Sequence, residues 1–167
     1  LSLSGLEQAL KVFKTTGDLK GEALIMDYYG TYYGSQKNME KSIKYFNKAY
    51  SLDDSLNNQF GMAKVSFKLA QVYQFTGNSD KAAIHTAQAI KLSENTVNIK
   101  QLALSYLMMG EIATTQHKYS IAEHYILRKA LPAFYYKLKD KTGTMNCYRQ
   151  LAKMYQKQKR LSEAKWF

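Results

Sequence analysis

Apolar residues recur along the chain at spacings of three and four residues, and short polar stretches interrupt this pattern. Apolar positions at i, i+3, i+4 and i+7 are typical of amphipathic helices. The polar stretches are only a few residues long, as expected between antiparallel helices. They fall at 15–21, 34–38, 76–80, 93–98, 115–118, 139–143 and 156–160. We therefore predict helices over 3–15, 19–34, 38–54, 58–75, 79–93, 97–116, 119–138 and 143–157, with a further helix starting near residue 160.

Two local signals agree with this helical interpretation. The chain has one proline among 167 residues, and proline disrupts helix interiors. Asn38 and Ser79 stand where two predicted helices begin, and both residue types are good N-caps. Lys41 and Ala82, three residues after them, lack the carboxylate or amide that would complete a capping box.

The same pattern returns after about 40 residues, so the helices form copies of one unit. Each copy has a large residue followed by Gly or Ala, and most have a tyrosine three positions later. These segments are Tyr29-Gly30-x-x-Tyr33, Leu69-Ala70-x-x-Tyr73, Met109-Gly110-x-x-Ala113 and Leu151-Ala152-x-x-Tyr155. A small residue stands 12 positions after each Gly or Ala, at Ser42, Ala82, Ala122 and Ala164.

Residues 25–50 hold six tyrosines interleaved with lysines, an arrangement that could form a stacking platform for single-stranded nucleic acid. The repeat favours a core role instead, because Tyr29 and Tyr32 correspond to Leu, Met, Val and Ile in the other copies. Tyr28 differs from them. Its equivalents are Lys68, Met108 and Gln150, so we expect it to face outward.

The recurring pattern resembles the tetratricopeptide repeat, whose units pair Leu-Gly-x-x-Tyr with a later Ala-x-x-x-Phe. Ser42-x-x-x-Phe46 supplies this second part in one unit. The resemblance implies an all-α fold, a right-handed α-solenoid of antiparallel helix pairs, over the whole chain. The units of 40–42 residues are longer than the usual ~34, as in repeat regions of bacterial signalling proteins, and the closing proline is missing. Pro132 lies instead beside a one-residue shift of the pattern at Ala130, which predicts a local distortion of that helix.

We expect a single array. Its parts would be the second helix of a truncated leading repeat at 1–17, repeats at 19–57, 58–96 and 97–140, and a truncated repeat at 142–167. The chain would then be part of a longer protein. Residues 1–13 of one copy could also complete residues 160–167 of another, in end-to-end self-association.

In this family the first helix of each unit lines a concave groove that holds a peptide. The resemblance therefore implies a candidate groove made of Asp27, Tyr28, Thr31, Phe67, Lys68, Gln71, Leu107, Met108, Glu111, Arg149, Gln150 and Lys153. Phe67, Leu107 and Met108 would form an apolar centre beside a basic end, which suits a peptide with apolar anchors and an acidic terminus. The alternative is that these residues contact adjacent helices. Binding of chaperone tails is not expected, because Asp27 and Thr31 stand where that clamp needs Lys and Asn.

The net charge of +11 is uneven, at +2 over residues 1–83 and +9 over residues 84–167. This asymmetry indicates either an acidic partner for the second half or an ordinary solvated face. Residues 128–165 contain eleven Lys or Arg, which leaves nucleic-acid binding as the alternative function. It is not favoured, because these lysines alternate with core positions and few aromatic residues remain free to stack.

Nothing in the sequence indicates catalysis or a cofactor. His85, His117 and His124 lack metal-ligand spacing, and Cys147 is expected in the core. Lys141-Thr142-Gly143 and Ser162-x-x-Lys165 resemble two pieces of a penicillin-binding signature, but in the wrong order. No signal-peptide layout or apolar run of membrane-spanning length is present, which leaves the cytoplasm favoured and the periplasm open. We therefore expect a non-catalytic protein-interaction scaffold, the sensory or regulatory part of a larger bacterial protein.

Overall fold

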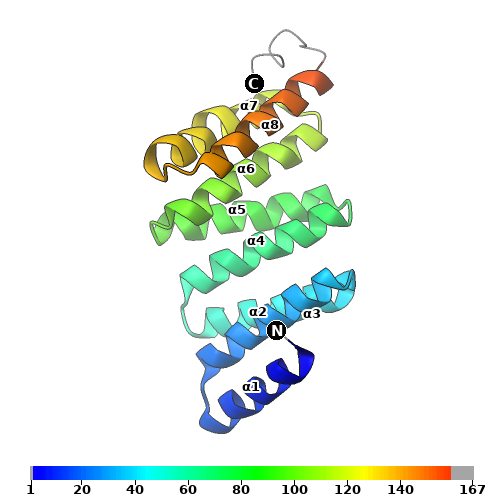
Figure 1. Ribbon diagram of the computed structural model, residues 1–167, viewed down its shortest axis with the longest axis vertical. Helices are drawn as coiled ribbons and strands as arrows, with labels where there is room; N and C mark the ends of the chain where they lie inside the picture. Colours follow the sequence, from blue (N-terminus) through cyan, green and yellow to red (C-terminus); the bar gives the residue numbers. More distant parts are fainter. Residues whose placement is uncertain (1, 159–167) are drawn as a thin grey trace.

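The computed structural model describes residues 2–158 and arranges them as an elongated stack of helices, with α1 at one end and α8 at the other (Figure 1). The α-helices are α1 (Leu3–Thr16), α2 (Leu19–Ser35), α3 (Met39–Ser55), α4 (Gln59–Phe75), α5 (Ser79–Asn95), α6 (Ile99–Thr115), α7 (Tyr119–Glu123) and α8 (Lys141–Lys157). Two π-helical segments, η1 (His124–Ala130) and η2 (Ala133–Lys137), follow α7. The predicted helix starting near residue 160 and the small residue Ala164 lie outside the described residues.

The helices α2 to α6 follow one another with a regular spacing. Each has 17 residues, and the N-cap residues stand at positions 18, 38, 58, 78 and 98. All five are Asp or Asn, and each side chain accepts a hydrogen bond from the backbone N–H three residues later. These bonds satisfy donors that a helix start leaves unpaired. The N-cap prediction is confirmed for Asn38 and is wrong for Ser79, since Asn78 caps α5 and Ser79 is its first residue.

The residue before each of these N-caps has a positive φ angle, which reverses the chain within a three-residue link. These residues are Gly17, Lys37, Asn57, Gly77 and Val97, and His117 and Lys139 continue the series. Left-handed backbone suits Gly and Asn and is unfavourable for a β-branched residue. Val97, with φ 52°, is therefore the most strained residue of the series.

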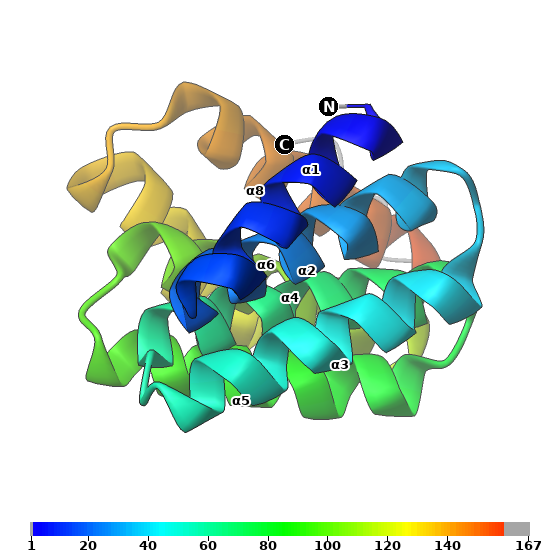
Figure 2. The ribbon, with the colours of Figure 1, turned by 90° about the horizontal axis from the view of Figure 1, so that it is seen from below.

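Helices pair within each unit through small residues. Ser42, Ala82 and Ala122 are fully buried, as the repeat predicts. Ser42 donates a hydrogen bond of 2.7 Å to the Gly30 carbonyl across the α2–α3 pair. A Cβ on Gly30 would lie 2.4 Å from the Phe46 ring, so this approach requires glycine. Figure 2 shows α3 and α5 on one side of the stack and α2, α4 and α6 in the layer beside them.

The tyrosine-rich segment is mostly part of this packing. Tyr29 is buried, and Tyr45 stacks against both Tyr29 and Tyr33 with ring centroids 4.9 Å and 5.3 Å away. The next unit repeats the second stack with Tyr73 and His85, also at 5.3 Å. Tyr28 is exposed. The predicted division is confirmed for Tyr29 and Tyr28, whereas Tyr32, also predicted as core, is half-buried and lies outside the core cluster.

The helix predicted over 119–138 is distorted, as Pro132 and the shift at Ala130 indicated. Its first five residues form the α-helix α7, and the π-helical segments lie on either side of residues 131–132. The N-caps Lys118 and Asp140 are 22 residues apart, whereas those of α2 to α6 are 20 apart. A π-helix has wider turns, so it accommodates the two additional residues without shifting α8 out of the stack.

The cluster of buried residues around α6 and α8 contains Cys147, as predicted. Burial and the nearby Glu111 raise the pKa of this thiol to about 12, which keeps it protonated. Within residues 2–158, none of the helices combines the length and apolarity needed to cross a membrane.

Candidate functional site

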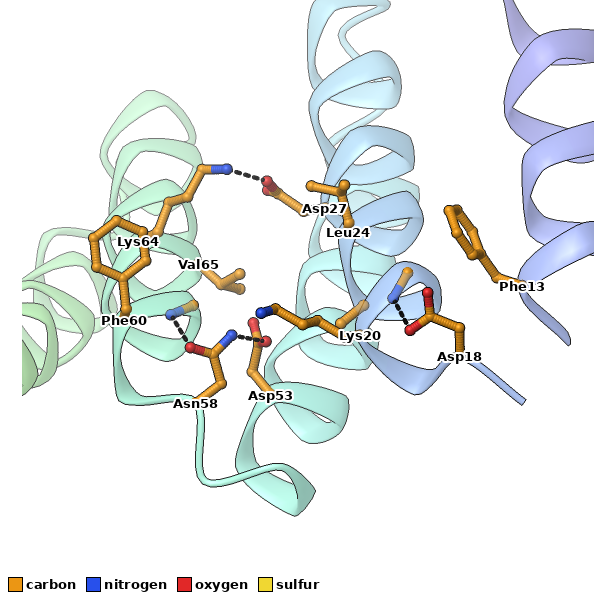
Figure 3. Close-up of a pocket in the computed structure, with 13 residues that line it drawn as sticks. Phe13, Asp18, Lys20, Leu24, Asp27, Asp53, Asn58, Phe60, Lys64 and Val65 are labelled. Atoms are coloured by element: carbon orange, nitrogen blue, oxygen red, sulfur yellow. Dashed lines mark hydrogen bonds and ion pairs between the residues drawn. The ribbon is translucent and has the colours of Figure 1, made fainter. Parts of the chain in front are cut away.

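A cavity of about 390 Å³ lies between α2 and α4, the first helices of two neighbouring units. We call it the α2–α4 pocket. Figure 3 shows Leu24 and Asp27 from α2 facing Phe60, Lys64 and Val65 from α4. Asp53, at the end of α3, and Asn58, in the link to α4, close it below. The pocket therefore lies at the junction of the two units, and most of its lining residues come from α2, the end of α3 and α4.

Two buried aspartates, Asp27 and Asp53, line this pocket at positions where some other units carry apolar residues. The equivalents of Asp27 include Phe67 and Leu107. Asp53 corresponds to Phe13, Ser93 and Phe134. Asp53 and the two phenylalanines each contact a helical glycine of the following unit. A Cβ on that glycine, Gly21, Gly61 or Gly143, would lie within 2.3, 2.3 or 2.1 Å of the facing side chain. A carboxylate thus replaces a phenylalanine ring at this junction.

Asp27 forms ion pairs that connect the two units. Lys64 Nζ lies 2.9 Å from one carboxylate oxygen, and Lys68 Nζ lies 2.5 Å from the other. Lys68 also donates a 3.0 Å hydrogen bond to Thr31. Because both lysines belong to α4, these bonds cross from one unit to the next. The structure therefore brings together three predicted groove residues, Asp27, Thr31 and Lys68.

Within residues 2–158 no lysine lies within ion-pair distance of Asp53, although Lys20 lines the same pocket and its side chain extends toward Asp53 in Figure 3. The hydrogen-bond donor to Asp53 among the described residues is Asn58 Nδ2, at 2.7 Å, and Asn58 also caps α4 by accepting from the Gly61 N–H. Burial raises the pKa of the Asp53 carboxyl; Asp27 adds to this, while Asn58 and Lys64 oppose it. A buried carboxylate with one neutral donor is poorly compensated, so a nearby cation would stabilise its charged form.

The rim of the pocket is apolar and open to solvent. Leu24 and Phe60 are 44% and 57% exposed, although both are large hydrophobic residues. They lie on the opposite walls formed by α2 and α4, with Asp27 beside Leu24 and Asp53 below (Figure 3). An aliphatic stem with a cationic head would match both the walls and the carboxylates.

The predicted apolar centre of the groove is wrong. Leu107 and Met108 are buried, and Phe67 is half-buried against a cluster formed by Met108, Ala82 and Ile112. These side chains fill the space between neighbouring helices and are not available to a peptide. This is the alternative that the sequence left open.

Of the other predicted groove residues, some are exposed to solvent and some are half-buried. Tyr28, Thr31, Gln71, Arg149 and Lys153 are exposed, whereas Glu111 and Gln150 are half-buried. Burial raises the pKa of Glu111, and Lys153 opposes this shift. A basic end at Arg149 and Lys153 is therefore present on α8.

Sequence reasoning missed Leu24, Asp53, Phe60 and Lys64. A partial signal for Asp53 was present in the repeat, since two of its equivalents are Phe13 and Phe134, although the third is Ser93. The rim residues Leu24 and Phe60 carry no such signal, because exposed apolar residues are common in any sequence. Within residues 2–158 no three His, Cys, Asp or Glu side chains are grouped closely enough to hold a metal ion.

The paired helices, their regular links and the pocket between first helices define a helical-repeat protein. Residues 21–95 match the family model of the tetratricopeptide repeat. This match confirms the resemblance seen in the sequence. Repeats of this family generally serve as non-catalytic scaffolds for protein partners. No curated protein sequence matches the chain.

Solved structures confirm the predicted all-α solenoid. BtubC (BKLC) from P. vanneervenii has a TM-score of 0.79 at 14% identity, covering 89% of this chain and 61% of that one. A Podospora anserina putative kinesin light chain with nearly identical TPR-like repeats gives 0.75 at 13% identity, covering 96% and 79%. Aspartyl phosphate phosphatase F from Bacillus subtilis gives 0.69 at 15% identity, covering 96% and 51%. At these identities the likeness concerns the fold alone.

Proposed function

We propose that the chain is a non-catalytic scaffold that holds a segment of a partner protein in the α2–α4 pocket. The partner inserts a lysine or arginine side chain, whose aliphatic stem contacts Leu24 and Phe60. Its cationic head approaches Asp53. The observation that carries this proposal is the buried Asp53 carboxylate, which lines an open pocket and contacts a glycine whose equivalents Gly21 and Gly143 contact phenylalanines.

The energetic argument starts from the cost of Asp53. A buried carboxylate destabilises the fold unless it is paired, and a phenylalanine at this position would add packing. A residue that differs in chemistry from its equivalents in other units, at a cost in stability, is expected at functional sites. A cation from the partner would add to the partial compensation that Asn58 and Lys64 give the Asp53 charge.

The basic end supports a second contact of the same partner. Arg149 and Lys153 are exposed on α8, the first helix of the last described unit. We infer that they meet acidic residues of the partner, which would accelerate association more than it would tighten the complex. The predicted sensory or regulatory role in a larger bacterial protein also stays a proposal. A transmembrane segment with a kinase domain, or a helix-turn-helix, encoded in the same gene would support it, and a lone repeat array would contradict it.

A random peptide library displayed on phage tests the pocket. Peptides selected on the native chain should share a lysine or arginine. Asp53→Asn keeps the shape of the side chain and removes its charge, so it should weaken these peptides about tenfold. The matched control is Asp54→Asn, an exposed aspartate on the same helix. Peptides that bind Asp53→Asn and the native chain equally, or the absence of any enriched peptide, would contradict the proposal.

Phe60→Ala tests the apolar wall in the same assay. It removes an exposed ring, so binding should fall while the melting temperature stays unchanged. Ile84→Ala is the control, since Ile84 is also exposed but lies on α5, away from the pocket.

A further inference from the structure

A second surface lies on η2 and the start of α8, far along the stack from the α2–α4 pocket (Figure 1). We call it the η2–α8 patch and define it by Tyr135, Tyr136, Lys139, Lys141 and Met145. Tyr136 is 72% exposed and Met145 62% exposed, and Tyr135 is exposed beside them. Exposed aromatic and Met side chains that gather in one place mark interaction surfaces.

The patch is concave. A cavity of about 410 Å³ is lined by Tyr135, Lys139, Lys141, Thr144 and Met145. The π-helical distortion accompanies this arrangement, because η2 buries Phe134 against Gly143 while the next two tyrosines face solvent. π-helical insertions are frequent at functional sites.

The charge around the cavity is positive and uncompensated. None of Lys137, Lys139 and Lys141 lies within ion-pair distance of a carboxylate in residues 2–158. The one acidic residue among them, Asp140, accepts a 3.0 Å hydrogen bond from the Gly143 N–H as the N-cap of α8. The Asp140 carboxylate therefore stabilises the N-terminus of α8, where the helix dipole favours a negative charge.

We propose that the η2–α8 patch binds an acidic segment of a protein that inserts one large apolar side chain between Tyr135 and Met145. The lysines attract the carboxylates of the segment, and the cavity takes the side chain. This site is separate from the α2–α4 pocket and has the opposite charge preference.

The geometry favours a protein over the other anionic partners. Tyr135 and Tyr136 lie at an interplanar angle of 83°, with ring centroids 4.8 Å apart. Successive nucleic-acid bases stack parallel to one another, so these two rings cannot both support neighbouring bases. A membrane presents a flat anionic surface, which would leave the cavity unfilled.

Fluorescence anisotropy with defined probes tests the proposal. The main probe is the labelled peptide Glu-Asp-Glu-Phe-Glu-Asp-Glu, compared with the same peptide carrying Ala in place of Phe. The Phe peptide should bind the native chain about tenfold more tightly than the Ala peptide, since a buried anchor dominates such contacts. A dT12 oligonucleotide and phosphatidylserine vesicles, in the same buffer, should bind more weakly than the Phe peptide.

Variants then locate the binding. The double variant Tyr135→Ser/Met145→Ser should lose the difference between the two peptides, and Lys139→Glu/Lys141→Glu should weaken both. Lys91→Glu, an exposed lysine of α5, is the charge control. Asp53→Asn should leave binding of the Phe peptide unchanged, which separates this inference from the α2–α4 pocket. The absence of binding, equal affinity for the Tyr135→Ser/Met145→Ser variant, or tighter binding of the oligonucleotide or vesicles would overturn it.

Discussion

At the residue scale, Asp53 has a measurable consequence for stability. Its pKa is raised above the ordinary value of 3.8 in the folded state. The folded chain therefore holds this proton more tightly than the unfolded chain, and stability falls as pH rises from the ordinary value through the raised one. Asp53→Asn removes this loss.

We predict that Asp53→Asn raises the free energy of unfolding at pH 7 by an amount on the order of 1 kcal/mol, the scale of an incompletely compensated buried polar group. The gain should shrink as the pH is lowered toward 4, where the native carboxyl takes up its proton. Urea unfolding at a series of pH values measures both effects. Asp54→Asn should show no such gain, and a gain that is independent of pH would contradict the assignment to burial.

Met108 gives a second prediction at this scale. Because Met108 is buried with Ile112 and Ala82, Met108→Ala should lower the free energy of unfolding by about 2–5 kcal/mol, as Leu69→Ala should. Thermal melts of both variants check this, with the exposed Ile84→Ala as the control. If Met108→Ala has the same melting temperature as the native chain, the Met108 side chain is accessible and the assignment to the core is wrong.

These residues also show what the sequence could predict. The repeat correctly located Ser42, Ala82 and Tyr29, because equivalent positions share one environment in every unit. It failed for Leu107 and Met108, because the tilt between adjacent units decides whether a position faces the groove or the next helix. That tilt depends on contacts between neighbouring units, and the repeated sequence pattern does not show these contacts.

At the element scale, the three-residue links repeat with little variation, but Val97 is ill suited to its place. It adopts φ 52° and is 78% exposed, so its side chain gains almost no packing to offset the backbone strain. Val97→Gly should therefore stabilise the chain by about 1 kcal/mol.

The reverse substitution is the matched control. Gly77→Val places a β-branched residue at φ 77° in the equivalent link after α4, and should destabilise the chain by about 1–2 kcal/mol. Urea unfolding of the two variants compares them directly. A loss of stability in Val97→Gly would mean that the Val97 side chain has a packing role.

Within residues 2–158 the helix boundaries were predictable within about two residues, apart from the distorted helix over 119–138, because polar links and caps are local signals. The position of the distortion near Pro132 was predictable from the sequence, but its π-helical geometry was not. Two additional residues could form a longer link, a bulge or a π-helix. The π-helical segments are the outcome that buries both Ala130 and Phe134.

At the scale of the whole molecule, the charge asymmetry separates two surfaces. The first half contains the acidic α2–α4 pocket, and the basic second half contains the η2–α8 patch. One partner with a cationic and an acidic region, or two different partners, would satisfy both. The predicted end-to-end self-association stays a prediction, and light scattering at high protein concentration tests it.

The central claim is that Asp53 recognises a cationic side chain. A double-mutant cycle measures this most directly: Asp53→Asn in the chain is combined with replacement of the lysine of a library-selected peptide by norleucine, and the four dissociation constants are determined by titration calorimetry. If Asp53 contacts that lysine, each single change weakens binding about tenfold and the second change adds little, because the shared interaction is already lost. Losses that simply add would show that the lysine binds elsewhere, and would contradict the account.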